Sequence, residues 1–192
     1  LGISDRYLRK LFEQQVGVSP KAYIQHQQIL FAKALLHQTH LAISDIAYAC
    51  GFNSVRRFND AFKRITTKTP SELKKLQVSD APIRLQMNYQ PPFDWQHWHD
   101  FSEYRLMTGI ETLGNSSYGR TFYWRGDDGK HVKGWFNAVH RPDKQGFNVS
   151  IEIEDAKYLY PVSQKIRQVF DLNANVEIIE QGLLQAGLPS HK

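Results

Sequence analysis

The sequence predicts two domains of different class, an all-α module followed by an α+β module with an antiparallel sheet and two helices. Charge divides unevenly: residues 1–80 hold 12 Lys and Arg against 6 Asp and Glu, whereas residues 81–192 hold 12 against 13. Aromatic residues lean the other way, with 8 in the first part and 16 in the second, including all four Trp. Hydrophobic spacing is helical up to residue 75 and alternates later. The seam lies near residues 77–83, where Pro82 interrupts the pattern.

Three helices are predicted in the first 50 residues. The first begins behind Ser4, an N-cap candidate, and stops at Gly17. The second covers roughly residues 20–37, with Ser19 as its cap and Pro20 at its first position. The residues expected to face the core are Leu8, Leu11 and Phe12 in the first helix, Tyr23, Ile24, Ile29 or Leu30, Ala34 and Leu35 in the second, and Ile46, Ala47 and Ala49 in a third that begins near Ile43 or Ser44.

An internal repeat with an offset of 50 residues relates two segments of this module. The residues that recur are Ser4, Arg6, Leu8, Phe12, Ser19 and Pro20, which return as Ser54, Arg56, Phe58, Phe62, Thr69 and Pro70. Because capping and core positions stay in register together, chance is a poor explanation. Each unit is predicted to be a helix, a tight turn and a helix with a polar, basic outer face, which is a helix-turn-helix.

The outward side of the second helix in each unit is the candidate DNA-reading surface. In this motif that helix lies in the major groove, and its N-terminal residues reach base edges. Arg can pair with guanine, and Asn can bond adenine or a phosphate. A merely solvated helix face is the alternative, and base contact against phosphate contact stays open for each side chain. The candidate DNA-binding residues are Arg6, Arg9, Lys10, Ser54, Arg56, Arg57, Asn59, Asp60 and Lys63.

Two stretches carry a family resemblance. Residues 51–73, GFNSVRRFNDAFKRITTKTPSEL, resemble the signature of the AraC-type transcriptional regulators, and residues 23–36, YIQHQQILFAKALL, resemble their linker helix. The resemblance covers residues 1 to about 75 and implies two helix-turn-helix units about one DNA turn apart. The family usually has Gly at the position of Thr67, so we expect a differently built turn there. Asp60 is less suited to DNA than the residue many members carry, and a bracing helix is expected upstream of Leu1.

The second module is predicted to open with a strand. Residues 86–95, QMNYQPPFDW, indicate a strand that ends at the Pro-Pro pair and a helix with Asp94 as its N-cap. Short alternating runs between residues 109 and 153, separated by the turn segments RGDDGK and RPDKQG, predict further antiparallel strands. A last helix begins near Tyr158. The first helix carries Trp95, Trp98 and Phe101, with Arg105 following, and the last carries Val162, Ile166, Val169 and Phe170.

No metal or cofactor site is predicted. His97 and His99 stand two apart on a helix and point in different directions, which disfavours a shared metal. Cys50, the only cysteine, excludes an internal disulfide and is expected to be a small core residue in a reducing, cytoplasmic setting. No apolar run approaches the length of a membrane span, and neither a Gly-rich phosphate loop nor an activated-serine signature occurs.

The second module also carries a resemblance. Residues 89–95, YQPPFDW, with Phe101, Arg105, GIE at 109–111 and SYGRTF at 117–122, resemble the N-terminal domain of AlkA-type DNA-3-methyladenine glycosylases II. That domain has a TATA-binding-protein-like α+β fold, and the match covers roughly residues 84–172. Residues 170–184 resemble the beginning of the catalytic region, whose aspartate is expected beyond Lys192. The predicted division is 1–78 for the DNA-binding domain, 79–83 for a linker, 84–172 for the AlkA-like domain and 173–192 for the start of the catalytic domain.

The two resemblances together are typical of composite Ada–AlkA proteins of the bacterial adaptive response to DNA alkylation. They imply that this chain binds duplex DNA sequence-specifically at promoters and regulates transcription, with alkylated DNA and RNA polymerase left open as further partners. The alternative is that the chain is part of a glycosylase enzyme. The chain itself is not expected to be catalytic, since both the catalytic aspartate and a methyl-acceptor domain are expected outside it. A structural or protein-interaction role of the sheet domain stays open, because its net charge of −1 argues against strong phosphate binding.

Overall fold

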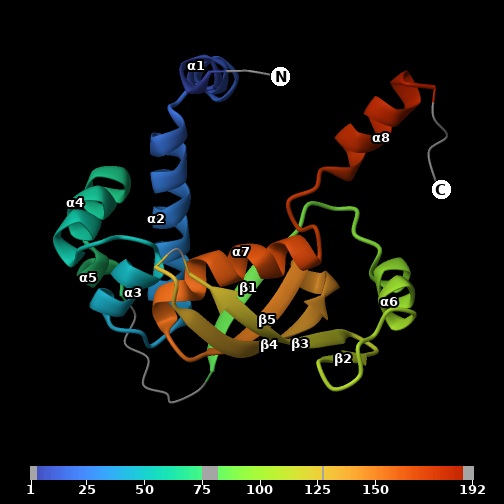
Figure 1. Cartoon of the computed structure of the whole chain (residues 1–192). Coiled ribbons are helices and arrows are strands. Elements are labelled where there is room, and N and C mark those ends of the chain that lie inside the picture. Colours follow the sequence, from blue (N-terminus) through green and yellow to red (C-terminus); the bar gives the residue numbers. More distant parts are fainter. Residues whose placement is uncertain (1–3, 75–81, 127, 188–192) are drawn as a thin grey trace. The chain divides into compact units, whose positions relative to one another are not determined.

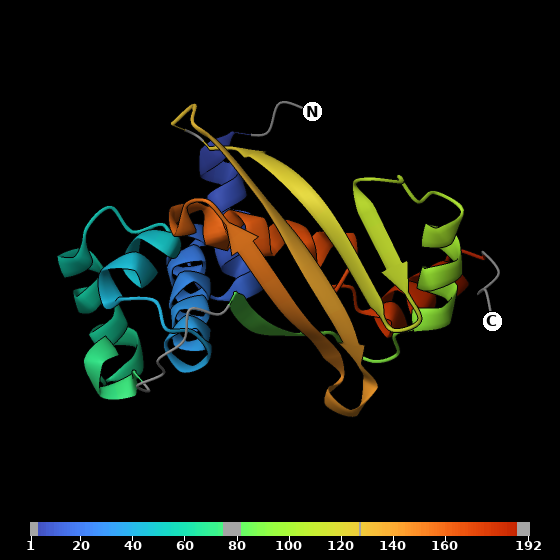
Figure 2. The same ribbon diagram turned by 90° about the horizontal axis from the view of Figure 1, so that it is seen from below.

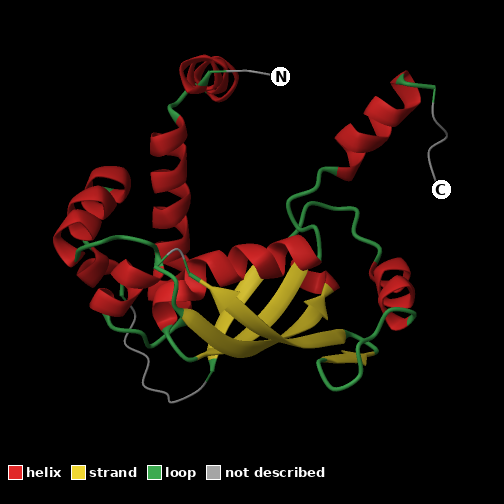
Figure 3. Ribbon diagram, viewed as in Figure 1, coloured by secondary structure: helices red, strands yellow, loops and turns green. Residues whose placement is uncertain are grey.

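The computed structural model describes residues 4–74, 82–126 and 128–187. The chain divides into two compact units, residues 1–79 with 156–160 and residues 80–155 with 161–192. The expected linker at 79–83 lies largely outside the described residues, and its last residue, Ile83, is the first of a strand. The helical unit and the sheet unit have the predicted classes (Figure 3).

Five helices form the first unit. They are α1 (Asp5–Val16), α2 (Pro20–Gln38), α3 (Ile43–Ala49), α4 (Val55–Thr66) and α5 (Pro70–Leu73). The predicted caps are present: the Ser4, Ser19, Ser54 and Thr69 hydroxyls each accept a hydrogen bond from the backbone N–H three residues later. Each such bond satisfies a donor that the first turn of a helix leaves without a partner. At α5, the Glu72 carboxylate also accepts from the Thr69 N–H, which completes a capping box.

The 50-residue repeat is present in the backbone. The two repeated helices that carry the candidate DNA-binding residues, α1 and α4, each have 12 residues and begin and end at positions 50 apart. Both end in a left-handed residue, Gly17 at φ 80° and Thr67 at φ 63°, whose N–H bonds the carbonyl four residues earlier. The expectation of a different turn at Thr67 was therefore wrong. The capping hydrogen bond holds the backbone in the same conformation, although a β-branched residue occupies it.

Burial in the helical unit is uneven along its length. Phe58, Ala61 and Phe62 of α4 are buried as predicted, and so are Ile46, Ala47 and Ala49 of α3. The predicted burial of Leu8 and Leu11 was wrong, because they are 48% and 39% exposed. Among the described residues, α1 rests mainly on the start of α2, where Phe12 meets Tyr23 edge to face at 5.7 Å, and this single neighbour covers only part of its apolar side.

The linker helix α2 is buried in its second half. Its buried residues are Ile29, Ala32, Leu35 and Leu36. Of the two residues predicted as alternatives, Ile29 is therefore the buried one and Leu30 is exposed. Tyr23 and Ile24 were predicted to be buried and are exposed, because they lie in the half that faces α1 rather than the core of α3 and α4. Ala34 is half-buried.

The second unit is built on a five-stranded antiparallel sheet. Its strands are β1 (Ile83–Asn88), β2 (Glu111–Gly114), β3 (Ser117–Arg125), β4 (His131–Arg141) and β5 (Gly146–Ile153), in the spatial order β1-β5-β4-β3-β2. Short 3-10 turns, η1 (Pro142–Lys144) and η2 (Ala156–Tyr158), follow β4 and β5. Gly134 on β4 is required, since a Cβ there would lie 2.3 Å from the Glu152 carbonyl oxygen.

One face of the sheet packs against α6 (Trp95–Glu103) and α7 (Leu159–Val169), and Figure 1 shows α7 lying across the strands. Asp94 caps α6 as predicted, accepting from the His97 N–H at 2.9 Å. Phe147 of β5 stacks on Phe170 at 4.4 Å, and the Trp98 ring lies 4.8 Å from Phe170. Val162 and Ile166 complete this core from α7. The last helix, α8 (Val176–Gln185), is capped by Asn175 and has no buried residue.

Candidate nucleic-acid interface

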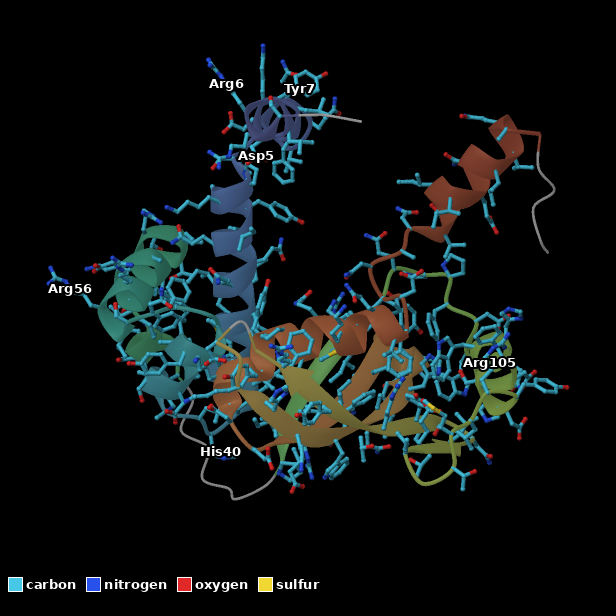
Figure 4. The ribbon with its side chains drawn as sticks, in the orientation of Figure 1. Asp5, Arg6, Tyr7, His40, Arg56 and Arg105 are labelled. Atoms are coloured by element: carbon cyan, nitrogen blue, oxygen red, sulfur yellow. The ribbon has the colours of Figure 1, made fainter. Side chains whose placement is uncertain are left out.

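The exposed side of α4 is one continuous polar stripe. At about 100° per residue, Arg56, Asn59, Asp60 and Lys63 fall within one sector, opposite the buried sector of Phe58, Ala61 and Phe62. All four stripe residues are exposed. Figure 4 shows Arg56 extending away from α4. The packing of Phe58, Ala61 and Phe62 therefore fixes which side of the helix faces outward. The exposed stripe has the size and shape to enter a DNA groove.

The N-terminus of α4 adds its own donors to this stripe. Arg56 and Arg57 occupy the second and third helical positions, where backbone N–H groups have no intrahelical partner. The Ser54 hydroxyl oxygen accepts from the Arg57 N–H at 3.3 Å, which leaves the hydroxyl proton free to be donated. Positive side chains and N–H groups at one helix start make a favourable environment for phosphate.

The corresponding stripe on α1 has a different charge pattern. Arg6, Arg9, Lys10 and Glu13 are the repeat counterparts of Arg56, Asn59, Asp60 and Lys63, and all four are exposed. Figure 4 shows Arg6 extending away from α1. The α1 stripe carries three cations and one carboxylate, whereas the α4 stripe carries two cations, one amide and one carboxylate. Two units with equal backbones thus present unequal chemistry to their ligand.

Arg57 belongs to a neighbouring side of α4, about 100° around from Arg56. The same side carries Arg64, seven residues later, whose guanidinium donates to the Gln25 side-chain oxygen of α2. This contact was not predicted from the sequence. The seven-residue spacing of Arg57 and Arg64 indicates that they share a side, but nothing local to α4 identifies a partner 39 residues away. The contact ties the end of α4 to the exposed half of α2.

The sheet unit holds a small cluster of one histidine and two carboxylates on α6. His99, Asp100 and Glu103 bring ligand atoms within 4.8 Å of one another, without His97. Asp100 accepts from Gln96 Nε2 at 2.7 Å, and its other neighbour is His99 Nδ1 at 3.3 Å. Exposed groups of this kind are common on surfaces without a metal. Cys50 is fully buried, as predicted, and burial raises the pKa of its thiol, which keeps it protonated and unreactive.

The largely buried carboxylate of Glu111, the first residue of β2, holds the loop that precedes this strand. Glu111 accepts from Tyr118 Oη at 2.6 Å and from the Met107 N–H at 3.0 Å, with Arg120 at 3.4 Å. Burial opposes its ionisation, but these hydrogen bonds and the Arg120 charge outweigh it, so the pKa of Glu111 lies below its usual range. Burial, together with the bond to Glu111, raises the pKa of Tyr118 to about 12. This cluster is structural.

No helix in the described ranges combines the length and the apolar character needed to cross a membrane.

The duplicated capped helices with their outward cations, followed by an antiparallel sheet with helices on one face, define a chain that joins an AraC-type helix-turn-helix DNA-binding region to an α+β domain. Residues 84–190 match the family model described as AlkA N-terminal domain, and residues 1–76 match the model described as helix-turn-helix domain. The chain belongs to the AlkA N-terminal domain family, here preceded by an AraC-type DNA-binding region.

Relatives match the whole chain or its first part. The probable bifunctional transcriptional activator/DNA repair enzyme AlkA of Mycobacterium tuberculosis H37Rv is 25% identical over 193 residues, which cover 95% of this chain and 37% of that protein. The HTH-type transcriptional regulator GlxA of Rhizobium meliloti is 38% identical over 74 residues, covering 38% of this chain and 23% of that protein. The crystal structure of an AraC-type regulator from Chromobacterium violaceum shares 36% identity, covers 38% of this chain and 65% of that chain, and has a TM-score of 0.36. The chain thus spans about a third of its mycobacterial relative.

Proposed function

We propose that this chain is the promoter-binding segment of a bacterial DNA alkylation-repair regulator. The observation that carries the proposal is the pair of equal helices, α1 and α4, each capped by serine and each presenting an exposed polar stripe. A stripe of this kind suits the major groove, because a helix fits there and its N-terminal side chains reach base edges. The single buried cysteine suits a reducing cytoplasm.

The stripe residues divide by role. Arg56 on α4 and Arg6 on α1 sit at the helix start on the outward sector, which suits contact with base edges. Arg57 lies on the neighbouring side of α4, which suits a phosphate of the groove wall, and the Ser54 hydroxyl suits a second phosphate. Arg9, Lys10, Asn59 and Lys63 extend the contact along both helices, while the Asp60 carboxylate repels DNA phosphates and weakens the contact made by α4.

The whole protein is proposed to combine this regulation with excision of alkylated bases. The support is the sequence match over 95% of the chain to a relative named as both a transcriptional activator and a DNA repair enzyme. A 3-methyladenine glycosylase must extrude its target base into a pocket that supplies acid-base chemistry. We assign that step to a part of the protein outside this chain, and we place the domain limits at 1–78 and 84–172.

The test is a titration of fluorescently labelled duplex DNA with the chain at several salt concentrations. We expect affinity to fall steeply with salt, at a slope of about −0.9 for each phosphate neutralised. The double variant Arg6→Ala and Arg56→Ala should bind more weakly, whereas Lys144→Ala, an equal change of charge per site in the sheet unit, should leave duplex binding unchanged. A flat salt titration, or equal losses in the stripe and control variants, would contradict the proposal.

A further inference from the structure

The face of the sheet opposite α7 presents exposed aromatic side chains. Because strand residues alternate between faces, β3 directs Gly119, Thr121, Tyr123 and Arg125 to this face, and β4 directs Lys133, Trp135 and Asn137 there. We call it the open face, and Figure 2 shows it with α7 behind the strands. Tyr123 is 60% exposed and Trp135 is 39% exposed. Large apolar rings on a water-facing sheet surface are costly to leave uncovered, which points to a ligand.

The two rings are held as a pair of flat platforms. The Trp135 indole N–H donates to Glu152 Oε2 at 3.0 Å, which fixes the ring on the sheet. Tyr123 stacks on His131 with centroids 4.9 Å apart and planes 17° apart. Thr121 pairs directly with Trp135 in the ladder, so Tyr123 is the diagonal neighbour of Trp135 on the same face, roughly 7–8 Å away. This spacing allows each ring to take one planar group of a chain-like ligand.

A hollow of about 470 Å³ adjoins Trp135. Its floor is Gly119, where a Cβ would lie 2.6 Å from Thr112 Oγ1 and 3.3 Å from the Phe136 carbonyl oxygen. Around it stand the Asn137 amide, the Thr112 and Thr121 hydroxyls and the exposed Ile110 side chain. An aromatic wall with a few hydrogen-bonding groups around an open floor suits a flat heterocycle that has polar edges and a ring face.

Two positive charges of the open face lie toward the β3–β4 hairpin, whereas Arg84 lies on β1 at the far edge of the sheet and Arg141 is paired with Asp143. Arg125 and Lys133 are exposed on this face, and Lys130 stands in the hairpin turn. Within the described ranges, none of the three forms a salt bridge. The nearest carboxylate to the aromatic pair, Glu152, is engaged by Trp135 on the β5 side. An anionic backbone would therefore follow the hairpin side, with its rings turned toward Trp135 and the hollow.

We propose that the open face binds single-stranded DNA, with unpaired bases stacked on Trp135 and Tyr123 and phosphates beside Arg125 and Lys133. Unpaired bases fit and paired ones do not, because duplex bases already stack on one another and hide their ring faces. The Asn137 amide offers a donor and an acceptor to the edge of a base in the hollow. This site goes beyond the proposed promoter binding and uses none of its residues.

The four Trp of the chain all belong to the sheet unit, so intrinsic fluorescence reports on this site and not on α1 or α4. The probe is an oligothymidylate of about 12 nucleotides, a length within the range that a single-strand-binding surface occupies. We expect the oligonucleotide to quench the Trp fluorescence of the full chain. The fluorescence anisotropy of a labelled oligonucleotide gives the affinity, which Trp135→Leu should lower by about 5- to 150-fold, the range expected for loss of one stacked base. Trp135→Phe should recover part of that loss, because the ring is retained.

Two controls keep the result separate from other effects. Trp124→Phe changes an aromatic of β3, the neighbouring strand, on the opposite face of the sheet and should leave oligonucleotide affinity unchanged. Arg56→Ala should weaken duplex binding without changing the oligothymidylate titration, so failure of one proposal is distinct from failure of the other. The inference is overturned if no quenching occurs, or if Trp135→Leu binds as the parent chain does while circular dichroism shows it folded. It is also overturned if Trp135→Leu abolishes self-association of the chain in sedimentation instead, which would assign the face to a second copy.

Discussion

Thr67 is held in a backbone conformation that suits glycine, and replacing it with glycine should stabilise the helical unit. Its φ is 63° and its ψ is −4°, nearly the values of its repeat counterpart Gly17, and its N–H bonds the Lys63 carbonyl at 2.9 Å. A left-handed conformation costs a non-glycine residue about 1–2 kcal/mol, and a β-branched residue belongs at the upper end. Thr67→Gly removes this cost without disturbing a buried side chain, because Thr67 is exposed.

Two losses offset part of the gain. Glycine widens the unfolded ensemble, which costs about 0.4–1 kcal/mol. The exposed hydrogen bond from Thr67 Oγ1 to the Thr66 carbonyl, 2.6 Å long, also disappears. The net gain in unfolding free energy is about 0.5–1 kcal/mol, which for a unit of this size raises the melting temperature by about 2–8 °C.

The assay is thermal unfolding of the chain followed by helical circular dichroism. Thr66→Gly is the matched control, because Thr66 lies one residue earlier inside α4 and its hydroxyl donates to the Phe62 carbonyl at 2.8 Å. That variant should melt at a lower temperature, since it widens the unfolded ensemble, relieves no left-handed strain and removes the hydrogen bond of the hydroxyl. A Thr67→Gly chain that melts at or below the temperature of the parent would refute the reasoning.

Three further predictions concern DNA, pH and chemistry. Arg56→Ala should reduce the free energy of binding to a selected cognate duplex by roughly 1–3 kcal/mol and relax the preference at one base position. Arg57→Ala should weaken binding to cognate and scrambled duplexes alike. Equal losses for both variants on both DNAs would rule out Arg56 as a base reader. Burial among the aromatic rings, including Trp95 at 5.2 Å, lowers the pKa of His140, so the unfolded chain takes up this proton first and the sheet unit should lose stability as pH falls below 6.5. In denaturant titrations between pH 7.5 and 5, the free energy of unfolding of His140→Gln should depend less steeply on pH than that of the parent chain. An unchanged dependence would mean that another group causes the loss of stability. Incubation of this chain with alkylated DNA should release no 3-methyladenine, and reproducible release would reveal a catalytic group within it.

The sequence was sufficient for features that depend on local chemistry. The serine caps, the 50-residue repeat and the buried side of α4 follow from capping and from helical spacing, and all are present in the structure. The two fold classes likewise followed from the change of hydrophobic period near residue 82. Each of these features is decided by residues within a few turns of one another.

Features that depend on contacts between residues distant in the chain could not be predicted from the sequence. Leu8 and Leu11 have the spacing of a core-facing pair, yet burial requires a partner helix that spacing alone does not supply. The contact of Arg64 with Gln25 depends on how α4 docks on α2. The aromatic pair of the open face could be identified only once the register of β3 and β4 was known. The pairing of Thr121 with Trp135 is what brings Tyr123 and Trp135 together on one side of the sheet.

The uneven burial of α2 has a consequence for how the protein could adapt to different operators. The helix has 19 residues and is about 28 Å long, and its buried residues begin at Ile29. One residue inserted before Ile29 would turn α1 about 100° around the helix axis and shift it about 1.5 Å, while leaving the packed half in place. The buried core can therefore stay unchanged while the orientation of α1 relative to α4, about the α2 axis, changes. Half-site spacing on DNA would then evolve through the exposed half of α2, independently of the stability of the fold.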